Sequence, residues 1–87
     1  MAPFTPNWVT HPGDHVAEYV EMSGISQAAW ARKAKITPKL LSTIIRRKAP
    51  VRARTAIKLG RVTGIKPEMW MALQSSWDLY HARKRKP

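Results

Sequence analysis

Hydrophobic side chains recur at every third or fourth position in five stretches of the chain, which is the spacing of one helix face. In the first stretch, Val16, Tyr19 and Val20 follow Asp14, and Gly24 provides a residue that ends helices easily. The pattern continues in four further stretches, at about 26–33, 38–47, 53–63 and from 67 onward. The sequence contains no strand-like alternation, so the pattern predicts an all-α domain of five helices.

Two of the predicted helices, at 26–33 and 38–47, are separated only by the residues Ala-Lys-Ile at 34–36. Ser26 and Thr37 occupy N-cap positions, and Pro38 follows at a position where proline loses no hydrogen bond. Ile36 is expected to be buried beneath the turn. The inward faces are expected to carry Ala29, Trp30 and the aliphatic part of Lys33 in one helix, and Leu41, Ile44 and Ile45 in the other.

This pair of short helices is typical of a helix-turn-helix, in which the first helix braces on the DNA backbone and the second enters the major groove. The second helix keeps a polar outer face once its hydrophobic residues are turned inward, comprising Thr37, Lys39, Ser42, Thr43 and Arg46. A generic helical hairpin would show the same periodicity. The polar face and the basic residues that follow it favour DNA binding.

The charge distribution strengthens this interpretation. The chain has 87 residues, with 16 Lys and Arg against five Asp and Glu, for a net charge of +11. Residues 1–43 contribute only +1 and residues 44–87 contribute +10. Such an asymmetric field indicates a polyanionic partner, most simply nucleic acid, with an acidic protein or a membrane surface as alternatives.

Composition argues against several other classes of protein. The length is that of one small domain, and the absence of cysteine excludes disulfides, thiolate zinc sites and thiol catalysis. His11 and His15 are separated by Pro12-Gly13, and no third metal ligand lies nearby in the sequence, so His11 is expected to pack or cap a helix. We therefore expect no catalytic residue, no metal and no cofactor.

Neither a secretory signal nor a transmembrane run is recognisable in the sequence. The expectation from these two observations is a cytoplasmic protein. Three parts are predicted: an extended arm at 1–12, a helix-turn-helix domain at 13–80 and a basic tail at 81–87 that frays.

The order of short motifs resembles the lambda-repressor-like (XRE-type) domains, and among these the HigA-type antitoxins of HigBA toxin–antitoxin modules. The resemblance covers about residues 11–79 and includes His-Pro-Gly-Asp at 11–14, Ser26-Gln27, Thr37-Pro38, Ile44-Ile45, Thr-Ala-Ile-Lys-Leu at 55–59, and the segment 67–74 with Asp78-Leu79. Its most discriminating element is Trp70-x-x-Leu73-Gln74, because generic repressors lack it.

The sequence also departs from this family. Ala34-Lys35 stands where Leu-Gly is common, Arg46-Arg47-Lys48 stands where Asn-Gly-Lys is common, and Trp30 replaces a usual leucine. The added cations favour DNA binding and leave the pairing with a toxin open. A standalone phage- or plasmid-type repressor without a toxin is therefore an alternative, and a basic RNA- or ribosome-associated protein is a second one.

The resemblance implies a bacterial homodimer that binds a palindromic operator in its own promoter and neutralises a RelE-like (HigB-type) mRNA-cleaving toxin. Such a protein would be associated with the nucleoid when bound to DNA. It also assigns residues to three contacts. Base edges would be contacted by Thr37, Lys39, Leu40 and Thr43. The DNA backbone would be contacted by Ser26, Gln27, Ser42, Arg46, Arg47, Lys48, Arg52 and Arg54. The dimer interface would include Trp70, Leu73 and Trp77.

Overall fold

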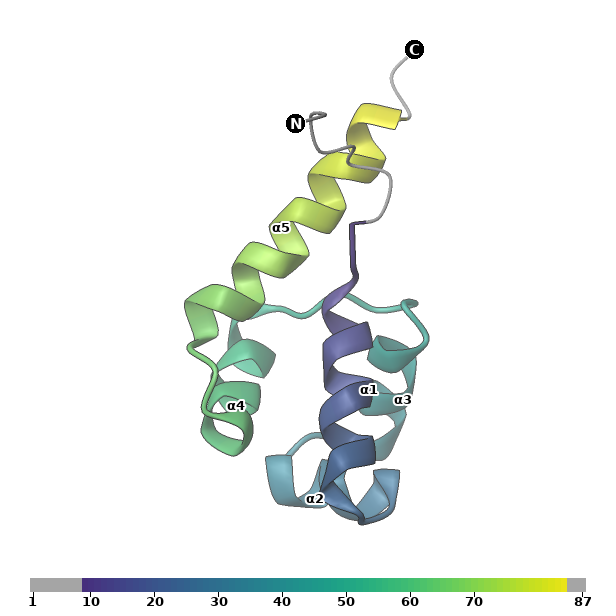
Figure 1. The fold of residues 1–87 in the computed structure, drawn as a ribbon, viewed down its shortest axis with the longest axis vertical. Coiled ribbons are helices and arrows are strands. Elements are labelled where there is room, and N and C mark those ends of the chain that lie inside the picture. Colours follow the sequence, from purple (N-terminus) through teal and green to yellow (C-terminus); the bar gives the residue numbers. More distant parts are fainter. Residues whose placement is uncertain (1–8, 85–87) are drawn as a thin grey trace, which may run out of the picture.

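A computed structural model describes residues 9–84 of the chain, which form an all-α domain (Figure 1). In chain order the helices are α1 (Pro12–Ser23), α2 (Gln27–Ala34), α3 (Pro38–Ile45), α4 (Ala53–Thr63) and α5 (Pro67–Lys84). The prediction of five helices in these stretches is confirmed. Most of the predicted N-terminal arm, residues 1–8, lies outside the described residues.

Helix α1 begins at Pro12, two residues earlier than the hydrophobic pattern predicted. The side chain of His11 caps it, because Nδ1 accepts a hydrogen bond of 2.8 Å from the Gly13 N–H. The Asp14 carboxylate in turn accepts from the His11 N–H at 3.2 Å, which completes a capping box. The Pro-Gly pair suggested an extended chain, but the first helical turn accepts proline because its N–H would have no helical partner.

The turn after α2 closes with a left-handed residue that is not glycine. Lys35 has φ of 62°, and its N–H donates to the Arg32 carbonyl at 3.1 Å. The next N–H, that of Ile36, reaches back to the Ala31 carbonyl at 2.9 Å. This pair of bonds is a Schellman motif, and it places the Ile36 side chain under the turn, buried as predicted.

The turn after α3 repeats this geometry. Arg47 has φ of 64°, and its N–H donates to the Ile44 carbonyl at 2.9 Å, while the Lys48 N–H donates to the Thr43 carbonyl at 2.8 Å. The motif ends α3 at Ile45, two residues before the predicted end at Arg47. Both helices of the pair therefore end on a basic residue held in a conformation that usually requires glycine.

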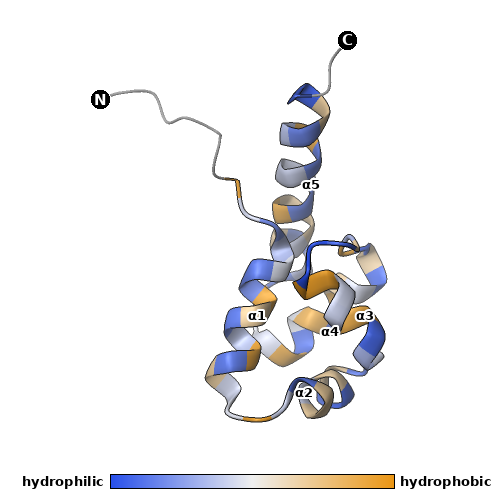
Figure 2. Ribbon diagram, turned by 90° about the vertical axis from the view of Figure 1, so that its right-hand side faces the viewer, coloured by the Kyte–Doolittle hydropathy of each residue, from blue (hydrophilic) through white to orange (hydrophobic). Residues whose placement is uncertain are grey.

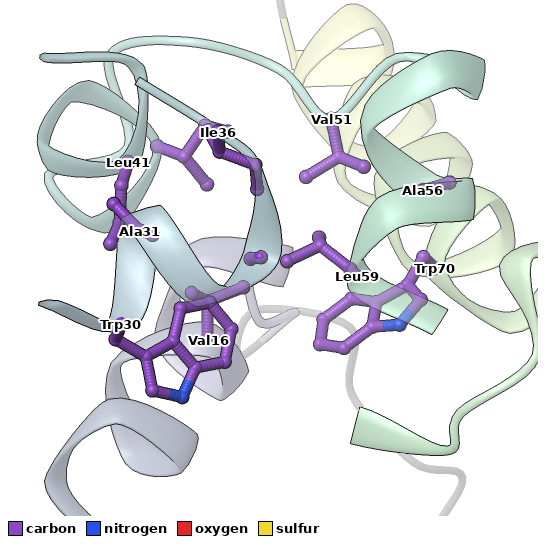
Figure 3. Packing of buried hydrophobic residues seen from close by; sticks show 11 residues of the cluster. Val16, Trp30, Ala31, Ile36, Leu41, Val51, Ala56, Leu59 and Trp70 are labelled. Atoms are coloured by element: carbon purple, nitrogen blue, oxygen red, sulfur yellow. The ribbon is translucent and has the colours of Figure 1, made fainter. Parts of the chain in front are cut away.

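The core collects one or more residues from every helix and from the turns (Figure 3). Trp30, Leu41 and Ile44 are buried as predicted, and Ile45 packs on the core with part of its side chain.

The prediction for Lys33 is wrong: this side chain is exposed. Its place on the inner face of α2 is taken by Ala31 and Ala34, which follow Trp30 by one and four positions. Ala29 is only half-buried.

Helix α5 packs against α4 and then projects beyond the other helices, while α3 and α4 lie on opposite sides of α1 in Figure 1. Helix α5 continues to Lys84, so residues 81–84 of the predicted tail are helical. Residues 85–87 lie outside the described part. None of the helices in residues 9–84 is long and apolar enough to cross a membrane.

Candidate nucleic-acid interface

Leu41 and Ile44 hold the inner face of α3 in the core, and this orientation turns the polar side chains of the helix outward. Thr37 and Lys39 are exposed at the beginning of the helix, whereas Leu40 and Thr43 are half-buried. The four residues predicted to contact bases thus lie on one short helix and its N-cap. Leu40 also packs partly against the core, so less of its surface is accessible than that of Lys39.

Hydrogen bonds within α3 determine what its two threonines can offer to a partner. The Thr37 hydroxyl oxygen accepts from the Leu40 N–H at 3.1 Å, so its hydrogen remains available for donation. The Thr43 hydroxyl is within hydrogen-bond distance of the carbonyl oxygens of Leu40, at 2.8 Å, and Lys39, at 3.1 Å. Its hydrogen points into its own helix. Thr43 can therefore accept from a base amino group or place its methyl group on thymine, but it is a poor donor.

The N-terminus of α2 has the features of a phosphate contact. Ser26 caps the helix by accepting from the Ala29 N–H at 3.1 Å, and Gln27 is exposed in the first turn. Backbone N–H groups and the helix dipole favour an anion at such an end. Ser42, the other uncharged residue predicted to contact the backbone, is half-buried on α3.

The loop between α3 and α4, residues 46–52, carries much of the positive charge, and Figure 2 shows strongly hydrophilic chain in this connection. We call it the basic loop. Arg46 and Lys48 are exposed on it, and the Arg46 Nε donates to the Ser42 carbonyl at 3.3 Å. Arg52, at the N-cap of α4, and Arg54 in its first turn are also exposed.

Arg47, also predicted to contact phosphate, makes contacts with two other helices. Its guanidinium forms a two-point ion pair with Asp14 of α1, with Nε–Oδ1 and Nη2–Oδ2 distances of 3.0 Å each. The same group lies 5.5 Å from the centre of the Trp77 ring of α5. The carboxylate occupies one edge of the guanidinium, and the Arg47 side chain is still 54% exposed, so the phosphate contact of Arg47 stays a prediction.

A second anchor holds the other end of the basic loop. Gln74 of α5 is 5% exposed, and its Oε1 accepts from the buried Val51 N–H at 2.8 Å. Its Nε2 donates to the Asp78 carboxylate at 2.9 Å. The loop is therefore fixed to α1 through Arg47 and to α5 through Val51. Sequence reasoning missed this role, although the position of Gln74, four residues after Trp70 on the same helix face, was a usable signal.

His11 lies beneath this junction and is almost fully buried. Its ring meets the Trp77 ring edge to face, with the ring centres 5.0 Å apart. Burial lowers the pKa of His11 below its ordinary value, the nearby Asp14 carboxylate opposes that shift, and the Arg47 guanidinium adds to it. A neutral imidazole is also what the α1 cap needs, because Nδ1 must accept a hydrogen bond there. The expectation that His11 packs or caps a helix is confirmed.

Among known sequences, no family model matches this chain. It is 37% identical over 73 residues to the uncharacterized HTH-type transcriptional regulator YddM of Escherichia coli, an alignment that covers 84% of this chain and 78% of the relative. The antitoxin HigA of Pseudomonas aeruginosa, solved with the higBA promoter, is 34% identical, with a TM-score of 0.80 and coverage of 86% and 83%. The chain belongs to the HigA-type helix-turn-helix family. PA4674 of the same organism, solved in complex with its operator DNA, is 32% identical, with a TM-score of 0.84 and coverage of 92% and 87%.

Helix α5 of this HigA-type chain carries the motif Trp70-x-x-Leu73-Gln74, whose residues differ in how deeply they are buried. Trp70 is 1% exposed and belongs to the core of its own chain, so it has no surface to offer to a second copy. Leu73 and Trp77, the other two residues predicted at the dimer interface, are half-buried and keep some accessible surface. Large exposed hydrophobic side chains nearby on the same helix are Met69, Met71 and Leu79.

The HigA-type chain has no group of three or more His, Asp or Glu side chains placed to hold a metal ion within residues 9–84. His11, His15 and His81 are instead engaged in local contacts. His15 bonds to the Thr10 hydroxyl at 3.1 Å, and the His81 ring lies 4.2 Å from that of Trp77, centre to centre.

Proposed function

We propose that this chain is a DNA-binding antitoxin that represses its own operon by inserting α3 into the major groove of operator DNA. The observation that carries the proposal is the two-sided character of α3. Thr37 and Lys39 are exposed on one side while Leu41 and Ile44 are fully buried on the other, so the reading side chains stand on a rigid base. The HigA-type relatives solved with promoter or operator DNA support this reading.

Each group of residues would do a different part of the work. Lys39 would donate to guanine O6 or N7, Thr37 would donate to a base or phosphate oxygen, and Thr43 would contact a thymine methyl group or a base amino group. Backbone phosphates would be held by Ser26, Gln27, Ser42, Arg46, Lys48, Arg52 and Arg54. If these four cations neutralise four phosphates per protomer, log K against log salt should fall with a slope of about −3.6.

A homodimer would place two α3 helices in successive major grooves of a palindrome, about 34–36 Å apart. We infer that the contact forms along α5 through Leu73 and Trp77, with Trp70 supporting them from the core. The exposed Met69, four residues before Leu73 and so on the same face of the helix, supports an interface there, because large exposed apolar side chains mark contact sites. Light scattering of Leu73→Arg should give a monomer mass with the helical circular dichroism retained.

The decisive experiment for DNA reading compares Lys39→Ala with Lys66→Ala, which removes the same charge from an exposed site outside α3. On the native operator, Lys39→Ala should lose about 1–3 kcal/mol of binding free energy and relax the preference at one base position. Lys66→Ala should leave the base preference intact. Operator discrimination that survives Lys39→Ala unchanged would contradict the proposed role of α3.

The proposed second activity is neutralisation of a RelE-like mRNA-cleaving toxin by direct binding. Co-expression with the product of the adjacent open reading frame, followed by size-exclusion chromatography, tests it. A stable complex that suppresses mRNA cleavage supports the antitoxin. If no small basic nuclease is encoded beside the gene and none co-purifies, the standalone repressor is the better description.

A further inference from the structure

A shallow groove of about 170 Å³ lies between the C-terminal ends of α2 and α4. Four basic side chains surround it: Lys33, Lys35, Lys58 and Arg61. Ala34 and Val62 form its apolar floor, and no acidic residue lines it. A water molecule occupies about 30 Å³ in the liquid, so the groove can admit a phosphate group together with water.

The groove lies away from the proposed operator contacts along both helices that form it. On α2, Gln27 is six residues before Lys33, which corresponds to about 9 Å of helix. On α4, Arg54 is seven residues before Arg61, or about 10 Å. All the residues that line the groove belong to α2, α4 and the turn after α2, and none of them belongs to α3.

Helix ends explain part of this arrangement but not all of it. Lys33 and Arg61 each lie in the last turn of a helix, where a cation offsets the negative end of the dipole. The same effect favours Lys35, the C-cap residue of α2, but it does not explain why two such ends meet, nor why Lys58 in the middle of α4 joins them. Within residues 9–84 the ion pair of Arg47 with Asp14 is the only one, so no carboxylate in that range neutralises the four cations.

We propose that this groove binds the backbone phosphates of a second DNA segment while α3 engages the operator. Three of its four cations are lysines, which act as flexible point charges and suit phosphates at varied positions. The apolar floor offers no donor or acceptor for a base edge. Binding in the groove is therefore independent of sequence, and its gain comes from release of counterions. The inference rests on the proposed operator binding, because the second duplex is held while α3 occupies the first.

The test is a bridging assay with the full chain. Operator duplex is immobilised, saturated with protein, and then challenged with a labelled duplex that lacks the operator. Lys58→Ala/Arg61→Ala is compared with Lys66→Ala/Arg83→Ala, which removes the same charge from exposed positions outside the groove. The groove variant should capture at least about tenfold less second duplex than the control, since two phosphate contacts are lost. Its operator affinity should equal that of the control.

Each other outcome counts against the proposal. Equal capture by the two double variants, or no capture by the natural chain, would show that the groove holds no second duplex. A selective loss of operator affinity in the groove variant would place the groove within the operator contact itself. Capture abolished by low millimolar inorganic phosphate, at matched ionic strength, would identify a site for a small anion. Failure of the first step, operator binding, would overturn the proposed function instead.

Discussion

The turns that end α2 and α3 share one backbone geometry, yet their left-handed residues behave differently. Lys35 follows the last residue of α2 and lines a groove together with three other basic residues. Arg47 ends α3 and pairs with Asp14, 33 residues away, while its guanidinium lies over Trp77. In residues 9–84 no carboxylate forms an ion pair with Lys35, whereas the charge of Arg47 links the end of α3 to α1. The basic residues of one helix pair therefore differ in whether a carboxylate of the same chain engages them.

Gly13 of α1 lies against the Ile44 carbonyl, beside the turn that ends α3. A substitution at Gly13 should have the largest effect on stability. A Cβ at this position would overlap the carbonyl oxygen of Ile44 and lie 2.8 Å from its carbonyl carbon, both in the backbone of α3. Gly13→Ala should therefore lower the free energy of unfolding by about 3 kcal/mol or more, measured by urea denaturation.

Gly64→Ala is the matched control for this substitution. Its Cβ would meet nothing within 4 Å, although the residue has φ of 82°. Its cost should be only about 1 kcal/mol, from the left-handed backbone alone. A similar loss in both variants would show that the close approach of α1 to α3 is unimportant.

Acidification should act on the second turn through His11. Because burial lowers the pKa of His11 in the folded state, the unfolded chain binds the proton more readily below about pH 6.5. The contribution of His11 is complete above that pH and declines as the pH falls toward the lowered value. Protonated Nδ1 can no longer accept from the Gly13 N–H, a cap worth about 1 kcal/mol.

Urea denaturation at about pH 7.5 and about pH 5.5 measures this decline. His11→Asn keeps a capping oxygen and removes the titration, so its stability should change less over the interval. His15→Gln, which replaces a half-buried histidine on the same helix, should behave like the natural chain. Identical pH dependence in all three proteins would rule out a role for His11.

The smallest effect should separate the two left-handed residues directly. Lys35→Gly relieves an unfavourable backbone conformation and should raise the free energy of unfolding by about 0.5–1 kcal/mol. Arg47→Gly gains the same relief but loses the ion pair with Asp14, which is worth about 0–1 kcal/mol because both side chains are partly exposed. Thermal and urea denaturation should show a gain only for Lys35→Gly. An equal gain in both would mean that the Arg47 ion pair is energetically neutral.

Local patterns predicted much of the fold. The N-caps Ser26 and Thr37, the buried Ile36 and the inward Leu41 and Ile44 all follow from spacing within a few residues. Contacts between distant residues could not be predicted in this way. The pairing of Arg47 with Asp14 and the bond from Val51 to Gln74 join segments 33 and 23 residues apart, and they depend on how the helices pack.

The candidate site shows the same division. Exposure of Thr37 and Lys39 followed from helix periodicity, whereas the inward direction of the Thr43 hydroxyl required the coordinates of the helix backbone. The base and phosphate contacts themselves stay predictions. The start of α1 at Pro12 was missed because a Pro-Gly pair more often marks a turn than the beginning of a helix.

The bond between the Val51 N–H and Gln74 makes one backbone amide a reporter of the whole basic loop. This amide is buried and its hydrogen bond crosses between two segments, so its hydrogen exchanges with solvent only when the loop leaves α5. A nuclear magnetic resonance exchange experiment on Val51 would follow that detachment at a single resonance. The lifetime of this hydrogen bond, compared with and without operator DNA, would measure how much DNA binding stabilises the contact between the basic loop and α5.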